Sequence, residues 1–185
     1  MKKIIIILIL IGAVAAIYFI AEKSAYRREE KNTAPLLSTM KIESNSFSPG
    51  EKIPSQFTCD GENINPHLAF RDIPEGTKSI TLISDDPDAP RGTWVHWTMW
   101  NIDPSVQEIS QRSIPKGGVE GTTSFGKAGY GGPCPHSGMH RYFFKLYALD
   151  TMLDLTADTD KEKLEKAMEG HILDRAEIMG TYERK

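Results

Sequence analysis

The stretch Ser-Asp-Asp-Pro-Asp-Ala-Pro-Arg-Gly-Thr-Trp-Val-His-Trp, residues 84–97, decides the fold of this chain. It joins two apolar runs, residues 79–84 and 94–102, which are rich in β-branched and aromatic side chains and bounded by turn residues. Runs of this kind are typical of strands, and the prolines around them leave too little room for a stable helix. We therefore predict two strands, the second returning alongside the first.

The second of these strands is expected to present two different faces. Alternate residues of a strand point to opposite sides of its sheet. Residues 94, 96 and 98 should share one side, and residues 95, 97 and 99 the other. This alternation puts Trp94, His96 and Thr98 together.

Further strands are expected on both sides of this pair. Turn residues recur every few positions between residues 40 and 75, which excludes long helices there and favours short strands. Residues 105–123 are predicted to be a loop. A third clear strand is predicted at residues 141–149, with His140, Tyr142 and Phe144 on one face.

One soluble helix is predicted near the end of the chain. Thr159 and Glu162 have the spacing of a capping box, and the helical pattern stops at Gly170. A short element at residues 176–182 follows. Many short strands and one late helix predict a mainly β fold, an antiparallel β-sandwich with a C-terminal helix.

The N-terminus carries a separate apolar segment. The chain has 185 residues and a net charge of -3, which suits one domain plus a short extension and gives no basic excess for nucleic acid. Residues 4–21 are uncharged and almost all apolar, longer than the roughly 7–15 residues of a signal-peptide core. We expect a signal anchor or signal peptide over residues 1–22, a linker over 23–38 and the domain over 39–185.

This leader implies a location. A transmembrane helix at residues 4–21 would make the membrane a partner and leave the domain anchored, with the extracytoplasmic side as the default for a Sec-type start. Cleavage near Ala21 or Ala25 would instead release a secreted or periplasmic domain. The length of the apolar run favours the anchor.

The chain contains two cysteines, Cys59 and Cys134. Outside the cytoplasm they can form one disulfide that closes a long loop, worth about 4 kcal/mol in the chain-entropy model. Two unrelated buried thiols are the alternative. They form no Cys-x-x-Cys pair and are too few for a structural zinc site.

The acidic residues of the turn are candidates for chemistry. Asp86 and Asp88 lie where a strand ends, and Pro87 and Pro90 restrict the backbone around them. His96 follows on the returning strand. A carboxylate such as Asp88 beside it would orient the imidazole and raise its pKa, an arrangement suited to holding an anion. A turn with solvated carboxylates is the alternative.

A second polar stretch, residues 129–142, is predicted to complete the site. Its glycines could let backbone N–H groups converge on a ligand oxygen as a nest, with Gly131, Gly132 and Pro133 at the rim. His140 and Tyr142 could add side-chain donors. A loop of glycine and proline without a ligand is the alternative, because the lysine and hydroxyl of a nucleotide P-loop are missing.

Metal and nucleophile chemistry are disfavoured. Four side chains could ligate a metal by type, namely Asp86, Asp88, His96 and His140, but their spacing matches neither a zinc helix nor a calcium loop. No Gly-x-Ser-x-Gly elbow is present, and a bridged Cys134 would not be a thiolate. We predict no metal and no cofactor.

Several motifs together resemble the phosphatidylethanolamine-binding protein family, in particular its bacterial and archaeal branch, often called Raf-kinase-inhibitor-like. They are Asp86-Pro-Asp-Ala-Pro90, Trp94-Val-His-Trp97, Gly131-Gly-Pro-Cys-Pro135, His140-Arg-Tyr142, Tyr147-Ala-Leu-Asp150, Cys59-Asp-Gly-Glu-Asn63 with Pro66, and Gly170-His-Ile-Leu173. The resemblance runs from about Met40 to the end of the chain. His136 departs from it, since another proline is expected there.

The resemblance implies a two-sheet antiparallel sandwich with a pocket for phosphate-bearing and other anionic groups. By position, it assigns the pocket to Asp86, Asp88, His96, His140 and Tyr142, with residues 131–135 as its rim. We expect a non-enzymatic binding protein for a phosphorylated small molecule, a lipid head group or a phosphorylated site. Inhibition of a kinase or protease, and a hydrolase or lyase with His96 and Asp88 as acid and base, are the alternatives.

Overall fold

A computed structural model describes residues 38–184. The predicted leader and nearly all of the predicted linker lie outside these residues, and the predictions for them stay predictions. Within residues 38–184, no helix combines the length and the apolar character needed to span a membrane. The mainly β architecture with two antiparallel sheets and one α-helix is confirmed for this part of the chain.

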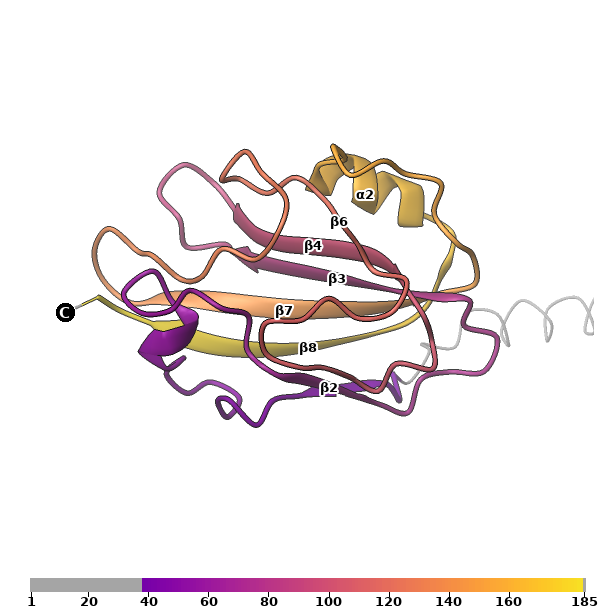
Figure 1. Cartoon of the computed structure of the whole chain (residues 1–185), viewed down its shortest axis with the longest axis horizontal. Coiled ribbons are helices and arrows are strands. Elements are labelled where there is room, and N and C mark those ends of the chain that lie inside the picture. The colour runs from indigo at the N-terminus through magenta and orange to yellow at the C-terminus, as the bar shows by residue number, and fades with distance from the viewer. Residues whose placement is uncertain (1–37, 185) are drawn as a thin grey trace, which may run out of the picture. The chain divides into compact units, whose positions relative to one another are not determined.

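The larger sheet has five strands, and every neighbouring pair is antiparallel (Figure 1). The strand pair predicted from residues 79–102 forms its centre, and the predicted third strand pairs with the first of them. In sheet order the strands are β6 (Val119–Glu120), β4 (Trp94–Ile102), β3 (Ser79–Asp86), β7 (His140–Leu149) and β8 (Ile172–Tyr182).

The smaller sheet has three antiparallel strands, ordered β1 (Lys41–Glu43), β2 (Leu68–Arg71) and β5 (Glu108–Ile109). Buried side chains of these strands, such as Leu68 and Phe70, join those of the large sheet, such as Leu82 and Phe144, in the main core. A short 3-10 helix, η1 (Ser55–Phe57), adds Phe57 to this core. The hydrophobic faces of both sheets are thereby removed from water, which stabilises the sandwich.

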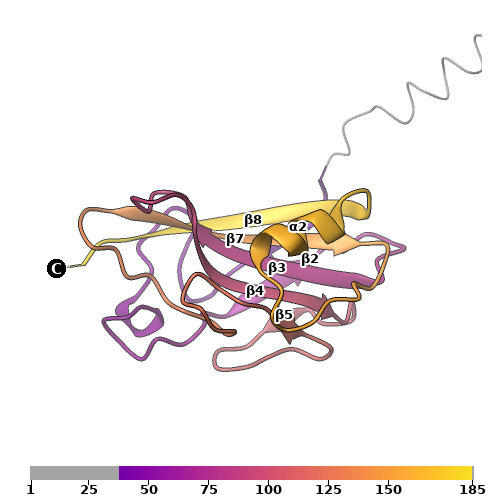
Figure 2. The same cartoon turned by 90° about the horizontal axis from the view of Figure 1, so that it is seen from above.

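Helix α2 (Lys161–Met168) covers the face of the large sheet that points away from the small sheet (Figure 2). Its Leu164 and Met168 pack with Ile83 and Trp100 in a second, smaller core. The N-cap is Asp160, whose carboxylate accepts a hydrogen bond from the backbone N–H of Lys163 at 2.9 Å. The predicted capping box at Thr159 is therefore wrong by one residue, because the carboxylate of the next residue takes that role.

Two predicted boundaries also change. The C-terminal element begins at Ile172 rather than at residue 176, since β8 pairs with β7 along almost its whole length. The predicted loop at residues 105–123 contains the short strands β5 and β6. Two-residue strands carry no readable alternation, and only pairing with remote strands makes them visible.

A β-bulge disturbs the predicted faces of β4. Ser84 pairs with Trp97 and Asp85 with Val95, so His96 is one residue extra on β4. The extra residue shifts by one position which side chains of β4 point to each side of the sheet. His96 packs against Tyr142 of the main core, and Trp97 belongs to the same core. The prediction that His96 and Trp97 point to opposite faces is therefore wrong.

Candidate functional site: a polar cavity at one end of the large sheet

A cavity of about 650 Å³ lies where β3 ends and where β4 and β7 begin. Because β3 is antiparallel to both neighbours, these three strand ends meet at one edge of the sheet. Three of the predicted site residues, Asp86, His96 and His140, line the cavity. Its full lining is Asp86, Ala89, Pro90, Arg91, Trp94, His96, Phe125, Cys134, Pro135, His136 and His140.

Asp86 and His140 form a buried pair in this cavity. The Nδ1 atom of His140 lies 2.7 Å from Oδ2 of Asp86. Only 3% of Asp86 and 8% of His140 is exposed. The other carboxylate oxygen of Asp86 accepts the backbone N–H of Asp88 at 2.8 Å. The carboxylate thus holds the imidazole with Nδ1–H toward Asp86, which leaves Nε2 of His140 for another partner.

His96 is held by a backbone carbonyl rather than by a carboxylate. Its Nδ1 lies 2.6 Å from the carbonyl oxygen of Gly131, and its ring packs edge-on against Tyr142 and Phe125. Burial lowers the pKa of His96, although the hydrogen bond to Gly131 opposes that shift. The expected pairing with Asp88 and the expected rise in the pKa of His96 are both wrong.

Asp88 is instead paired with Arg141, outside the cavity lining. Its carboxylate accepts hydrogen bonds from Nε and Nη2 of Arg141 at 2.9 and 2.7 Å, and from the backbone N–H of the same residue. These bonds lower the pKa of Asp88 to about 2. Because the pKa is depressed from 3.8, the stabilisation is present above that pH and is lost as the pH falls toward about 2. Asp88 therefore fastens the turn to the start of β7.

Tyr142 lies beneath the cavity and not in its wall. Its ring contacts both histidines, edge-on to His96 at 5.2 Å and stacked with His140 at 6.5 Å between centroids. Burial, followed by the negative charge of Asp86, raises the pKa of the Tyr142 hydroxyl, so it stays protonated. That hydroxyl is buried without a hydrogen-bond partner among residues 38–184. Tyr142 thus supports the two imidazoles from below.

The glycine loop does not form the predicted nest. The N–H of Gly131 donates to the carbonyl of His96 at 2.9 Å, and the N–H of Gly132 donates to Oδ1 of Asn63 at 2.7 Å. Pro133 has no N–H, and its carbonyl accepts from Cys59 at 3.1 Å. These backbone groups are already used within the protein, so the loop forms a wall and supplies no amide donors from Gly131 or Gly132.

Glycine is required at position 132 for space. A Cβ atom there would collide with the backbone carbonyl of Phe57 and lie 2.8 Å from Cα of Thr58. We expect Gly132→Ala to lower the free energy of unfolding by about 2–3 kcal/mol, as overpacking against backbone does. Urea denaturation measures this loss.

Gly138→Ala in the same stretch is the matched control for Gly132→Ala. A Cβ atom at Gly138 would meet open space, but the residue has a φ of +72°, so only backbone strain of about 1 kcal/mol is expected. An equal loss of stability in the two variants would contradict the steric explanation.

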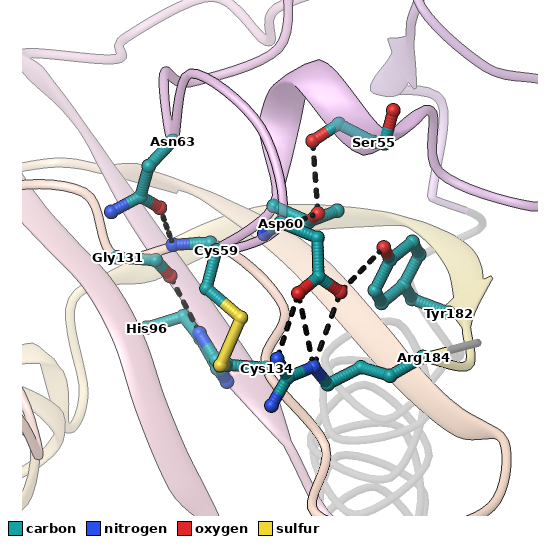
Figure 3. Close-up of a disulfide and its surroundings, with 11 residues drawn as sticks. Ser55, Cys59, Asp60, Asn63, His96, Gly131, Cys134, Tyr182 and Arg184 are labelled. Atoms are coloured by element: carbon teal, nitrogen blue, oxygen red, sulfur yellow. Dashed lines mark hydrogen bonds and ion pairs between the residues drawn. A yellow bond between two sulfur atoms is a disulfide. The ribbon is translucent and has the colours of Figure 1, made fainter.

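A disulfide fastens the cavity wall to the loop after η1 (Figure 3). Cys59 and Cys134 are bonded, with their Cα atoms 5.4 Å apart, so the first of the two alternatives is confirmed. The neighbouring Asp60 accepts the Tyr182 hydroxyl at 2.9 Å and Nε of Arg184 at 3.0 Å. The segment around Cys59 thus joins the C-terminal end of β8 to the wall that includes Cys134.

Several wall residues were not predicted as site residues. Arg91 adds a guanidinium to the lining, and Phe125 adds an apolar wall. His136, singled out above as a departure from the motif, adds a third imidazole, while Trp94 and the predicted rim residue Pro135 supply further apolar surface. The ring of Phe125 packs edge-on against Trp94 at 5.4 Å. Arg91 lies three residues after Asp88 in the same turn, which was the available signal. Phe125 lies in a loop remote from both motifs, and no pattern marked it.

Residues 38–184 contain no group of three or more His, Cys, Asp or Glu side chains placed to hold a metal ion. In the cavity, the Nδ1 atoms of His96 and His140 are already bonded to Gly131 and Asp86. The arrangement instead suits a polar organic or inorganic ligand, because acceptors, cationic donors and apolar surfaces face one space.

Sequence relatives cover most of this chain. It is 47% identical over 150 residues to a UPF0098 protein of Methanothermobacter thermautotrophicus, an alignment that covers 78% of this chain and 99% of the relative. It is 48% identical over 152 residues to a UPF0098 protein of Pyrococcus abyssi, covering 77% of this chain and 84% of the relative. These relatives share the domain and carry no functional name.

Two solved structures resemble the domain. A phosphatidylethanolamine-binding protein homologue from Chlamydia trachomatis has a TM-score of 0.77 and 40% identity, over 80% of this chain and 99% of that one. YbcL of Escherichia coli, described as a new member of the mammalian phosphatidylethanolamine-binding protein family, has a TM-score of 0.75 and 33% identity. The match covers 79% of this chain and 99% of YbcL. The family model described as phosphatidylethanolamine-binding protein matches residues 43–183. The chain therefore belongs to the phosphatidylethanolamine-binding protein family.

Proposed function

We propose that this chain is a non-enzymatic binding protein whose cavity takes phosphate-bearing or other anionic ligands. The family fold itself implies ligand binding. The observation that carries the anionic preference is that the guanidinium of Arg91 and the imidazoles of His136 and His140 line one space, with the ring of His140 held by the Asp86 carboxylate. Arginine and histidine are side chains that bind phosphate oxygens by charge-assisted hydrogen bonds.

The two aspartates do not prevent anion binding in this proposal. Asp88 is paired with Arg141 by two side-chain hydrogen bonds and does not line the cavity. Asp86 lines it, but both of its oxygens already accept hydrogen bonds, one from His140 and one from a backbone N–H. The repulsion that two free carboxylates would exert on a phosphate is therefore reduced.

Two observations favour binding over the hydrolase or lyase alternative. His96 and Asp88, the expected acid and base, are bonded to Gly131 and Arg141 rather than to each other. The lining residues include no serine, threonine or lysine, and Cys134 is part of a disulfide. A hydroxyl, amine or free thiol nucleophile is therefore not offered to a ligand by the residues that line this cavity.

The proposal also places the domain outside the cytoplasm. The Cys59–Cys134 disulfide is typical of proteins in oxidising compartments. An uncharged run at residues 4–21 fits export or anchoring. Fractionation of cells, with protease accessibility of the domain, would test both the compartment and the predicted attachment to the membrane.

Calorimetric titration of the full chain with inorganic phosphate and with phosphoethanolamine tests the ligand class. We expect Arg91→Ala and His140→Asn each to weaken binding at least tenfold, about the effect of losing one charge-assisted bond. Asparagine keeps a donor toward Asp86 where Nδ1 stood and removes Nε2. Arg175→Ala, an exposed arginine on β8 away from the cavity, is the control. Unchanged binding in Arg91→Ala and His140→Asn would contradict the proposal.

A further inference from the structure

We propose that His96 makes the cavity selective for anions that carry their own hydrogen-bond donor, a P–O–H or an N–H group beside the anionic oxygens. In this inference, Nε2 of His96 is the acceptor that the ligand's donor must meet. It rests on the proposed function, since it assumes that an anion occupies this cavity. It deepens that function by naming a chemical requirement on the ligand.

The tautomer of His96 follows from its partner. A carbonyl oxygen can only accept a hydrogen bond, so the 2.6 Å contact with Gly131 requires a hydrogen on Nδ1 of His96. The carbonyl of Gly131 thus takes the hydrogen on Nδ1, and the ring lines the cavity. Nε2 is therefore the ring atom left for a ligand, and in the neutral imidazole it carries a lone pair and no hydrogen.

The surroundings of His96 keep the ring neutral. Only 3% of the residue is exposed, and the rings of Tyr142 and Phe125 pack edge-on against it. This burial lowers the pKa of His96 despite the nearby negative charge of Asp86. Nε2 of His96 thus faces a ligand as an acceptor and not as a donor.

A fully deprotonated anion fits such a lining poorly. The guanidinium of Arg91 can satisfy its oxygens, but its lone pairs would oppose the lone pair on Nε2 of His96. An acceptor that is desolvated and left unpaired is costly, so the ligand should supply the missing hydrogen. Near neutral pH, phosphate keeps at least one proton, whereas sulfate, of the same shape, keeps none.

Competitive calorimetry on the full chain with phosphate and sulfate, near neutral pH and at matched ionic strength, is the test. We expect phosphate to bind at least tenfold more tightly than sulfate. His96→Asn keeps a donor for the Gly131 carbonyl but removes the acceptor at Nε2. In that variant the preference should fall to about twofold or less, through weaker binding of phosphate. His171→Asn, an exposed histidine paired with Asp150, should keep the full preference.

A second pair of probes distinguishes a lipid source from a soluble one. Vesicles of phosphatidylethanolamine offer an N–H donor beside the phosphate, and vesicles of phosphatidylcholine do not. Retention of the protein on phosphatidylethanolamine vesicles alone supports a lipid head group as the ligand, selected because its N–H group meets Nε2 of His96. Binding of soluble phosphate without retention on either kind of vesicle supports a soluble ligand.

Nitrogen-15 NMR of the free protein checks the acceptor directly and does not require a variant that folds. We expect the Nδ1–H tautomer of His96, with Nε2 unprotonated, near neutral pH. A protonated Nε2, or equal affinities for phosphate and sulfate, would overturn the inference. Equal affinities that are lost in Arg91→Ala would leave the proposed function standing. Failure of both anions to bind would overturn both proposals.

Discussion

Replacing both cysteines, as Cys59→Ser with Cys134→Ser, is expected to lower the free energy of unfolding by about 4 kcal/mol. The bond joins residues 75 positions apart, so it removes much of the freedom of the unfolded chain. For a domain of this size, such a loss corresponds to a fall in Tm of about 10 °C. Urea denaturation and thermal melting of the full chain measure the two quantities.

The reduced wild-type protein supplies the matched control for the cysteine variant. A dithiol reductant should destabilise the wild-type protein by about the same amount, and it should leave the double variant unchanged. The wall of the cavity would still be held by the hydrogen bond from the Gly132 N–H to Asn63, so we expect a folded protein with a looser loop. A double variant as stable as the oxidised wild type would show that the bond contributes nothing.

Asp85→Asn is expected to cost about 3 kcal/mol, although Asp85 lies outside the cavity. Its carboxylate is fully buried and accepts from Nζ of Lys145 at 2.8 Å and from Nζ of Lys161 at 2.8 Å. Lys161 belongs to α2, so this pair joins the helix to the centre of the sheet. Asparagine keeps the shape but leaves two partly buried ammonium groups without their counter-charge.

The pKa of Lys161 agrees with this account. Burial alone would lower the pKa of Lys161, but the hydrogen bonds and charges of Asp85 and Glu165 together raise it above its ordinary value. A raised lysine pKa contributes stability that is present at neutral pH and is lost as the pH rises through the folded-state pKa. The Asp85 prediction should therefore be measured near neutral pH by urea denaturation.

Asp72→Asn is the matched control for Asp85→Asn. Asp72 pairs with Lys41 at 3.2 Å, but more than half of each side chain is exposed, so the loss should stay below about 0.5 kcal/mol. Asparagine also tolerates the positive φ of 55° at this position. Equal losses in the two variants would mean that burial of Asp85 does not strengthen its pairing.

The sequence was sufficient for the elements whose patterns are long and local. Residues 79–84 and 94–102 are apolar, β-rich and bounded by turns, and they form the central strands of the large sheet. Asp86, His96 and His140 stand at ends of predicted antiparallel strands, so their convergence in one cavity followed from that prediction. The resemblance in motifs identified the family before any geometry was known.

The tertiary structure decided which partner each of these groups has. Asp88 is bonded to Arg141 of β7, and His96, the extra residue at the β4 bulge, is bonded to the carbonyl of Gly131 in a remote loop. The predicted pairing of His96 with Asp88 was wrong, since alternation gives the side of a sheet but not the rotation added by an extra residue.

The sequence by itself determined a mainly β domain, two cysteines able to pair, and a cluster of carboxylates and imidazoles at one edge of a sheet. Only the tertiary structure decided that the amides of Gly131 and Gly132 are used internally, that Phe125 and Arg91 line the cavity, and that Nδ1 of His96 is bonded to the Gly131 carbonyl. The physical reason is one of range. Periodicity and turn residues act within a few positions, whereas hydrogen-bond partners and cavity walls come from segments that meet only after folding.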